Sequence, residues 1–246
     1  MDSERFARLC QLTPRDGGIG TLGEKTLHAV VKCYLESRPT CREVRVGRRV
    51  ADIANEQGIW EIQTRGFQKL RSKLTDFLKR GPVTVVYPVP ALKTLYWVDP
   101  ATGALSPPRR SPKKGRELDI LYEMYKIKDF LQNESLSFLV LLMEVEEYRL
   151  ADGWSRQGHN GSTRIERVPT ALVREAVFHR PSDFAPYLPS FERPFTAREF
   201  AVSVGRHVNF GNPALNVLLA LGLVRCAGKQ KNAYLYEYTP SFFASS

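Results

Sequence analysis

Apolar residues at helical spacing predict two helices in the first part of the chain. In residues 21–36, apolar side chains recur at i, i+3, i+4, i+7 and i+8 from Leu27, which places them on one face of a helix. Thr21 is suited to cap the start of this helix. Residues 67–80 repeat the pattern, and Gly81, followed by proline, predicts the end of the second helix.

Short extended stretches between these helices predict strands. Residues 42–53 form two such stretches with a turn at Gly47, and residues 58–64 form a third after the connection "NEQG". The β-branched run at residues 82–89 is typical of a strand covered on both faces. The predicted order is helix, three strands, helix, strand, which indicates an α/β fold.

Further elements continue this fold toward residue 178. Residues 93–99 predict another strand, residues 116–131 another helix, and residues 136–150 a buried strand. Residues 152–164 are rich in turn-forming residues and are predicted to form an exposed loop.

Four prolines in residues 179–194 indicate a linker or a domain boundary. After it, Thr196 and Glu199 form a capping box at the start of a helix, a short apolar helix follows, and residues 224–238 predict two strands around a basic tip. Helices followed by a hairpin in this order outline a winged helix. We therefore predict three parts of the chain: residues 1–178, 179–194 and 195–246.

The composition is that of a soluble globular protein. Apolar residues make up 43% and charged residues 25% of the chain, and the longest apolar run, residues 136–145, is too short to span a bilayer. The N-terminal residues lack an apolar leader, and the four cysteines include no C-x-x-C pair that would suggest a zinc site. We expect a cytoplasmic protein that does not bind membranes.

The charge balance favours a polyanionic partner. Lysine and arginine total 36 against 26 acidic residues, which gives a formal charge of +10 and a pI near 9.6. Residues 65–80 hold six basic residues and one acid, and residues 101–116 hold five basic residues and no acid. A solvated surface is one interpretation, but prolines and a glycine break the second cluster, so a mobile loop that contacts phosphate is at least as well supported. The residues predicted to bind DNA are Arg65, Arg71, Lys73, Arg109, Arg110, Lys113, Lys114, Arg156, Arg164, Lys229 and Lys231.

Two acidic residues oppose each other in the hairpin predicted around "NEQG". If this connection is tight, Ile53 pairs with Trp60. The next pair is then Asp52 with Glu61, and Gln63 projects from the same face. Two opposed carboxylates repel each other, and a Mg²⁺ or Mn²⁺ ion between them would remove the repulsion. The alternative is structural, with Asp52 at a strand end and Glu61 in solvent.

A third acid, Glu24, borders the apolar face of the first helix. From there its carboxylate can lean over the sheet edge toward Asp52. The alternative is a capping box with Thr21 that holds the start of the helix. His28, four residues later on the same side, is predicted mainly as a packing residue.

The order of these motifs resembles the PD-(D/E)XK nuclease superfamily. The resemblance covers residues 21–89 and rests on the whole order "GEKTLH…VADI…EIQT…PVTVVYP". It implies a restriction-endonuclease-like αβββαβ core with a mixed central sheet. It also implies that Asp52 and Glu61 bind Mg²⁺, with Glu24 in support.

Gln63 departs from the family pattern, because the family usually has a lysine there that polarises or orients the attacking water. Lys25, Arg65 or Lys69 could supply the missing positive charge, and we prefer Lys69, one turn into the next helix. The predicted catalytic residues are Glu24, Asp52, Glu61, Gln63 and Lys69.

These features predict a Mg²⁺- or Mn²⁺-dependent nuclease that hydrolyses phosphodiester bonds, with DNA favoured over RNA as the substrate. The expected role is that of a structure- or lesion-directed endonuclease in DNA repair, with a C-terminal winged helix that binds DNA or docks a protein. A homodimer is left open. The alternative is a non-catalytic DNA-binding protein that keeps a nuclease-like fold as a scaffold, and Gln63 in place of lysine supports it.

Overall fold

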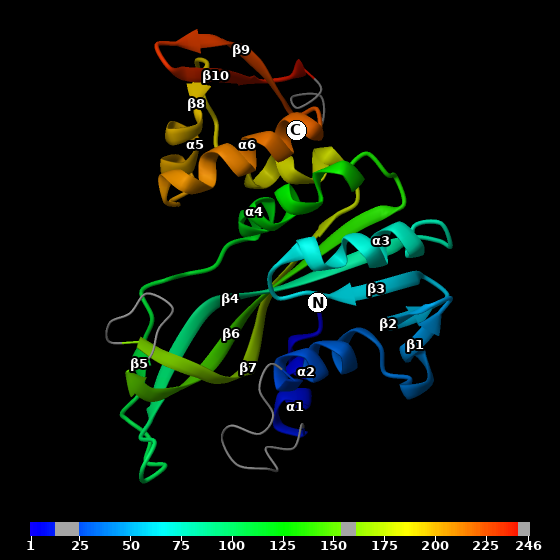
Figure 1. The fold of residues 1–246 in the computed structure, drawn as a ribbon, viewed down its shortest axis with the longest axis vertical. Coiled ribbons are helices and arrows are strands. Elements are labelled where there is room, and N and C mark those ends of the chain that lie inside the picture. The colour runs from blue at the N-terminus through cyan, green and yellow to red at the C-terminus, as the bar shows by residue number, and fades with distance from the viewer. Residues whose placement is uncertain (13–24, 154–160, 241–246) are drawn as a thin grey trace.

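A computed structural model describes residues 1–12, 25–153 and 161–240 of the chain (Figure 1). The strands are β1 (Arg42–Val46), β2 (Arg49–Asn55), β3 (Gly58–Ile62), β4 (Val83–Val98), β5 (Arg109–Arg110), β6 (Leu136–Gly153), β7 (Gly161–Phe178), β8 (Phe195–Thr196), β9 (Val224–Gln230) and β10 (Ala233–Tyr238). The α-helices are α1 (Ser3–Leu12), α2 (Lys25–Leu35), α3 (Arg71–Phe77), α4 (Ile120–Met124), α5 (Ala197–Ser203) and α6 (Gly211–Ala220). The 3₁₀ turns are η1 (Pro39–Cys41), η2 (Phe67–Leu70), η3 (Glu117–Asp119), η4 (Tyr125–Phe130), η5 (Pro181–Tyr187) and η6 (Val208–Phe210).

A mixed sheet forms the centre of the molecule. Among the described residues it contains seven strands in the order β1-β2-β3-β4-β6-β7, with β5 paired to β4. β1, β2 and β3 form an antiparallel meander, β4 is parallel to both β3 and β6, and β7 is antiparallel to β6. The predicted α/β class and the mixed central sheet are confirmed.

The first part of the sheet follows the predicted order of elements. α2, β1, β2, β3, α3 and β4 succeed one another along the chain, with the turn between β1 and β2 at Gly47. In the β2–β3 hairpin, Ile53 lies opposite Trp60 and Ala54 lies opposite Ile59. The register predicted from the connection "NEQG" is therefore confirmed.

Helices cover both faces of the sheet, with α3 on one face and α1 and α2 on the other (Figure 1). Adjacent residues of β4 belong to different apolar clusters: Val85 joins the cluster that includes Leu74 of α3, and Val86 joins the cluster that includes Val31 of α2. All four side chains are fully buried. The β-branched stretch of β4 is thus covered on both faces, as predicted.

β4 is one strand of 16 residues where the sequence predicted two. It runs through Pro88 and Pro90, which cannot donate ladder hydrogen bonds. The carbonyl of Val86 accepts a hydrogen bond from the Gln63 N–H just past the end of β3. Pro88 and Pro90 lie two and four residues after Val86, so their nitrogens point to the same side of β4. On that side β3 has already ended. The prediction of two separate strands was wrong, because proline is tolerated where a strand has no neighbour on the side that its nitrogen faces.

Two other expectations differ from the structure. Residues 161–164 were assigned to a loop but belong to β7, because β6 extends to Gly153 and pairs with β7 over most of its length. The helix predicted over residues 116–131 consists instead of η3, α4 and η4, since Ile127 has a non-helical φ of −123°. α1 was not predicted at all.

The C-terminal elements form a smaller sheet in the order β8-β10-β9, beside α5 and α6. The Thr196 hydroxyl accepts a hydrogen bond from the Glu199 N–H at 3.2 Å, and the Glu199 carboxylate accepts one from the Thr196 N–H at 2.7 Å. The predicted capping box is confirmed.

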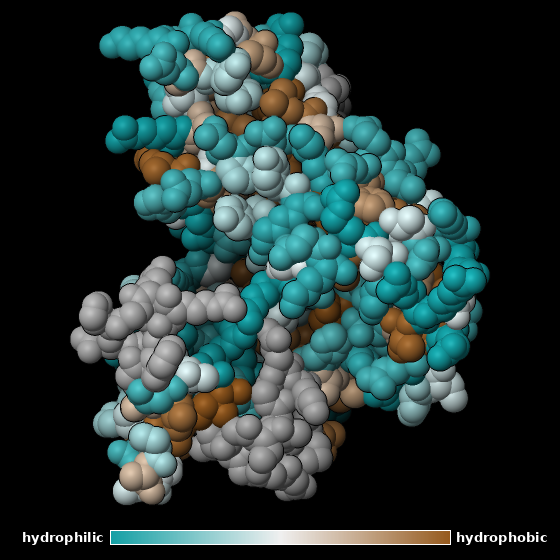
Figure 2. Space-filling view, viewed as in Figure 1, coloured by the Kyte–Doolittle hydropathy of each residue, from teal (hydrophilic) through white to brown (hydrophobic). Residues whose placement is uncertain are grey.

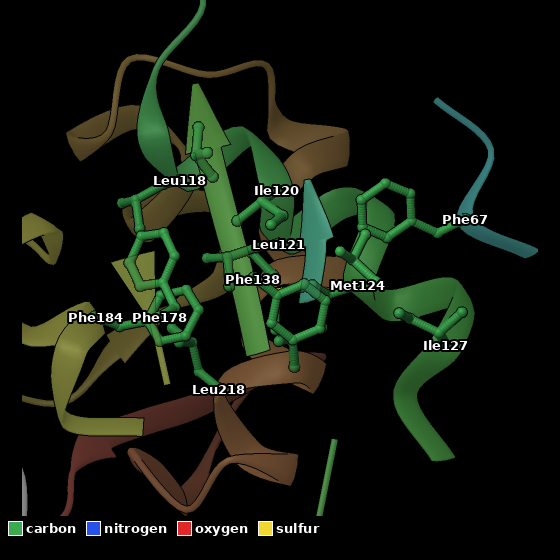
Figure 3. Packing of buried hydrophobic residues seen from close by; sticks show 14 of the residues in the cluster. Phe67, Leu118, Ile120, Leu121, Met124, Ile127, Phe138, Phe178, Phe184 and Leu218 are labelled. Carbon is green, nitrogen blue, oxygen red and sulfur yellow. The ribbon is translucent and has the colours of Figure 1, made fainter. Parts of the chain in front are cut away.

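The proline-rich segment packs against the core. Phe184 of η5 stacks on Phe178 of β7 with 4.1 Å between ring centroids, and Leu218 of α6 belongs to the same cluster (Figure 3). One apolar cluster therefore runs from the sheet to the C-terminal helices, and the division into three parts stays a prediction. None of the helices in the described residues has the length and apolarity that a membrane crossing requires.

Candidate functional site

The two opposed acids lie where β2 and β3 separate. The last backbone pair before the separation is Ile53 with Trp60. Beyond it, Oδ2 of Asp52 accepts a hydrogen bond from the Ile62 N–H at 2.7 Å, so that a side chain takes the place of the next backbone bond. This contact holds the Asp52 carboxylate between the two strands, next to Glu61.

Glu61 is almost fully buried, with 2% of its surface exposed. Its two carboxylate oxygens accept hydrogen bonds from the Lys73 ammonium of α3 at 3.0 and 2.8 Å. Burial, followed by the negative charge of Asp52, raises the pKa of Glu61 to about 7, although Lys73 acts in the opposite direction. The two carboxylates therefore do repel each other, and the surroundings compensate only in part.

Asp52 has a different environment. Oδ1 lies 3.2 Å from Nε2 of His28, on α2. Burial acts to raise the pKa of Asp52, but the interaction with His28 and the Ile62 N–H lower it below its ordinary value. α2 and α3 cover opposite faces of the sheet (Figure 1), so each acid receives its partner from a different helical layer.

The sequence did not identify these two partners. Lys73 was assigned to DNA phosphates, and Lys69 was preferred as the cation beside the acids. Instead, Lys73 contacts Glu61, while Lys69 is an exposed residue of η2. Lys73 follows Lys69 by one helical turn, and His28 lies three residues before Val31, so spacing alone contained a weak signal for both.

Gln63 makes local contacts in the turn after β3. Its side-chain amide donates a hydrogen bond to the backbone carbonyl of Arg65 and so stabilises the turn after β3. The backbone N–H of Gln63 donates to the Val86 carbonyl at 2.8 Å. Glu24, the third predicted acid, lies outside the described residues.

The donor set fits a Mg²⁺ or Mn²⁺ ion held by two carboxylates. Within the described residues, no group of three histidine, cysteine or acidic side chains is arranged to hold a metal. Mg²⁺, however, is commonly bound by one or two carboxylates together with water and substrate phosphate. Asp52 and Glu61 are hard oxygen donors, and the pKa of Glu61 is raised first by burial and then by the charge of Asp52, the part that a cation would relieve.

The basic residues around this site differ in their freedom to bind phosphate. Arg65 is exposed in the turn after β3. Arg71 is already engaged, since its guanidinium contacts Asp129 at 2.6 Å and the Lys126 carbonyl at 3.0 Å. Of the predicted DNA-binding residues in this region, Arg65 is the one left exposed without such a partner in the described structure.

The second basic cluster is part of the sheet. Arg109 and Arg110 form β5, which pairs with β4, and the Ser111 N–H donates to the Lys93 carbonyl at 2.9 Å. Lys113 and Lys114 follow on the same segment and are exposed. The predicted mobile loop is instead tethered to β4 by backbone hydrogen bonds.

The remaining predicted contacts lie on other parts of the molecule. Lys229 and Lys231 lie at the tip of the β9–β10 hairpin, where the Lys229 ammonium is 4.4 Å from the centre of the Tyr234 ring. Arg164 belongs to β7 and pairs with Arg149 of β6. Arg156 lies outside the described residues.

Sequence comparison places the site within a protein family. The sequence model of a domain of unknown function (DUF8091) matches residues 25–179, more than half of the chain. The chain belongs to that family. The match includes Asp52, Glu61 and Lys73 and ends one residue after β7.

One relative covers most of the chain. An uncharacterized protein of Treponema pallidum (strain Nichols) is 27% identical over 225 residues, which cover 90% of this chain and 88% of that protein. The similarity therefore extends beyond the span of the family domain. No solved structure matches the chain.

Proposed function

We propose that this protein is a Mg²⁺- or Mn²⁺-dependent nuclease that hydrolyses phosphodiester bonds in DNA. The observation that carries the proposal is the pair Asp52 and Glu61, opposed where β2 and β3 separate, with the Lys73 ammonium on Glu61. Two carboxylates and one cation at a strand separation provide a metal site and a positive charge for the reacting phosphate.

The order of elements supports a restriction-endonuclease-like core. α2, the antiparallel β1–β2–β3 meander, α3 and the parallel β4 follow in the order that the PD-(D/E)XK resemblance implies. Lys73 supplies, from α3, the positive charge that Gln63 does not provide. In this proposal, Lys73 takes over the role of the lysine that the resemblance leads us to expect at Gln63.

The residues of the site have distinct tasks in this proposal. Asp52 and Glu61 would hold the metal, which would supply Lewis-acid activation of water and charge stabilisation at the phosphoryl oxygens. His28 holds the Asp52 carboxylate in place, and Lys73 limits the repulsion at Glu61 and faces the developing negative charge. Arg65, exposed at the end of the hairpin, binds a backbone phosphate. The formal charge of +10 favours DNA over neutral substrates.

The C-terminal elements support a winged helix. β8, α5, η6, α6 and the β9–β10 hairpin follow one another, with β10 between β8 and β9, so a 3₁₀ turn stands where a further helix of that fold would lie. Lys229 and Lys231 at the hairpin tip are suited to contact phosphate. α6 buries Leu215 and Leu218 and exposes Asn212, so its capacity to read bases is small. A phosphate-contacting or protein-docking role therefore suits this module best.

The second candidate is a non-catalytic DNA-binding protein with a nuclease-like fold. Gln63 turns to the Arg65 carbonyl, and the oxygens of both acids already have protein partners. A scaffold stabilised by these contacts would bind DNA without cleaving it. A repair role and a cytoplasmic location accompany the nuclease proposal as expectations.

A cleavage panel tests the proposal directly. Single-stranded, duplex, branched, mismatched and base-damaged DNA are incubated with the wild-type protein in Mg²⁺, Mn²⁺ or EDTA, and the thermal unfolding midpoint is measured in the same buffers. We expect metal-dependent cleavage of at least one DNA form and a higher midpoint with metal. DNA binding with neither cleavage nor a metal-induced shift of the thermal midpoint would support the scaffold instead. Absence of cleavage, binding and shift would reject both candidates.

Lys73, rather than Lys69, is expected to be the lysine that cleavage requires. Lys73→Met should lower the single-turnover rate by about 100-fold, because the reacting phosphate loses a positive charge in a partly buried position. Lys69→Met serves as the matched control and should leave the rate unchanged. If Lys69→Met were the slower variant, Lys69 would be the catalytic cation, as the sequence predicts. The role of Lys73 would then be confined to holding Glu61.

A further inference from the structure

A basic cavity lies further along β4 than the acidic pair and shares no residue with it. It has a volume of about 630 Å³ and lies between the middle of β4, the segment before η3, Arg167 of β7, and the residues that follow α5. Figure 2 shows a hollow between the C-terminal helices and the far part of the sheet. Asp119 is the acidic residue that lines the cavity among the described residues. The basic side chains that line it are Lys93, Lys113, Lys114, Arg116, Arg167 and Arg206.

Two of these six cations are neutralised by carboxylates. Arg206 contacts both oxygens of Asp119, the longer contact being 2.8 Å, and Arg167 contacts Glu147 at 2.7 Å. Arg116 donates to the Val204 carbonyl at 2.7 Å but forms no ion pair within the described residues. Arg116 and the three lysines are therefore four cations around the cavity that have no carboxylate partner in the described structure.

Lys93 is the most informative of these cations. It comes from β4, is half-buried, and its ammonium makes no hydrogen bond or ion pair in the described part of the chain. Burial lowers the pKa of Lys93, and the charges of Arg167, Arg149 and Lys113 lower it further, while Glu147 opposes the shift. An unpaired, half-buried ammonium among other cations destabilises the fold, and such groups are typical of binding sites.

The backbone holds the exposed lysines in position. The Gly115 N–H donates to the Pro90 carbonyl at 2.9 Å, directly after Lys113 and Lys114. Gly115 lies so close to β4 that a Cβ atom there would approach Val89 Cγ1 to 2.3 Å. This part of the segment is therefore fixed against the sheet, and both lysines are presented at the rim before any ligand binds.

We propose that this cavity binds a ligand through phosphate groups that carry two or more negative charges. Lysine ammonium groups and the planar guanidinium of Arg116 are the side chains that most often bind such groups. The same chemistry is offered by the phosphorylated end of a nucleic-acid strand and by a free polyphosphate.

The cavity is distinct from the acidic site. None of its lining residues belongs to the Asp52–Glu61 site. Glu61 pairs with Val85 of β4, and the cavity begins at Tyr87 and reaches Lys93 along the same strand. At about 3.3 Å per residue, the cavity extends from roughly 7 to 26 Å beyond Val85 along β4. The inference concerns binding alone and does not depend on cleavage.

Binding is measured in EDTA, so that metal at the acidic pair does not contribute. The probes are sodium tripolyphosphate and a single-stranded oligonucleotide with either a 5′-phosphate or a 5′-hydroxyl. We expect Lys93→Met to weaken binding of the preferred probe by about tenfold or more, because one charge-assisted contact is lost. The same substitution should raise the thermal midpoint of the ligand-free protein, a change that loss of a structural residue would not give.

Two further variants make the outcome decisive. Arg8→Gln removes one positive charge from the exposed surface of α1, on the opposite face of the sheet, and should bind as the wild type does. The double variant Lys113→Gln/Lys114→Gln changes only exposed residues and should lose affinity even if Lys93→Met proves unstable. Preference for the 5′-phosphate assigns the site to a strand end, and tight tripolyphosphate binding assigns it to a free polyphosphate. Failure of all probes to bind, or equal loss in Arg8→Gln, would overturn the proposal.

Discussion

Asp52→Asn is expected to lower metal-dependent DNA cleavage by about 1,000-fold or more, because metal assistance contributes several kcal/mol to such reactions. The asparagine oxygen can still accept the hydrogen bond that Asp52 Oδ2 receives from the Ile62 N–H, so the separation of β2 and β3 should be preserved. The negative charge opposite Glu61 is lost, and with it one of the two anionic ligands. Single-turnover cleavage in Mg²⁺ measures the loss, and Mn²⁺ titration by calorimetry measures the affinity.

A matched control separates this effect from a general change in charge. Asp76 also lies close to the hairpin, on α3, but it is partly exposed and pairs with Arg49 at 3.0 Å. Asp76→Asn should therefore cleave DNA at the wild-type rate and bind Mn²⁺ equally well. Cleavage by Asp52→Asn that stayed close to the wild-type rate would move the reaction away from this hairpin.

The opposed acids could be predicted from sequence because hairpin register is a local property. A short connection fixes which residues face each other, and alternation then fixes which side chains share a face. The pairing of Ile53 with Trp60 followed from these two rules, and it brought Asp52 beside Glu61. The register therefore needed no knowledge of the rest of the chain.

The partners of the acids could not be predicted in the same way. Lys73 and Lys69 both lie on the segment after β3, and the choice between them depends on how α3 is rotated against the sheet. That rotation is set by burial of Leu74 and Phe77, which turns Lys73 toward Glu61 and leaves Lys69 exposed. His28 reaches Asp52 through the docking of α2 on the other face, which is likewise a tertiary contact.

The continuity of β4 and the whole of β7 were missed for a related reason. Pro88 and Pro90 interrupt β4 in sequence but fall on an edge that β3 has left, which only the sheet topology reveals. β7 pairs with β6 over most of its length, a long-range pairing that the sequence analysis did not predict. The basic cavity arises from the same topology, because β4, β7 and the residues after α5 meet only in the folded chain.

Glu61→Gln is expected to unfold at a higher denaturant concentration than the wild type at pH 8, and to have lost cleavage. The pKa of Glu61 is about 7 in the folded protein, against an ordinary value of 4.5. At pH values between these two pKa values, the folded state holds a proton that the unfolded state has released. The free energy of unfolding therefore falls as the pH rises. This contribution to the free energy of unfolding is fully present below about pH 4.5. It is lost by about pH 8, and the loss amounts to about 3 kcal/mol. An uncharged glutamine does not undergo this loss.

Urea unfolding in EDTA at pH 5 and pH 8 measures the difference, with Glu4→Gln, an exposed acid of α1, as a control that should follow the wild type. Parallel pH curves for wild type and Glu61→Gln would mean that Glu61 titrates normally, and the repulsion that favours a cation would then be absent. If the wild type alone loses stability with rising pH, added Mn²⁺ should restore it at pH 8 in the wild type but not in Glu61→Gln. The same carboxylate would then destabilise the metal-free fold and bind the metal, because burial beside Asp52 produces both effects.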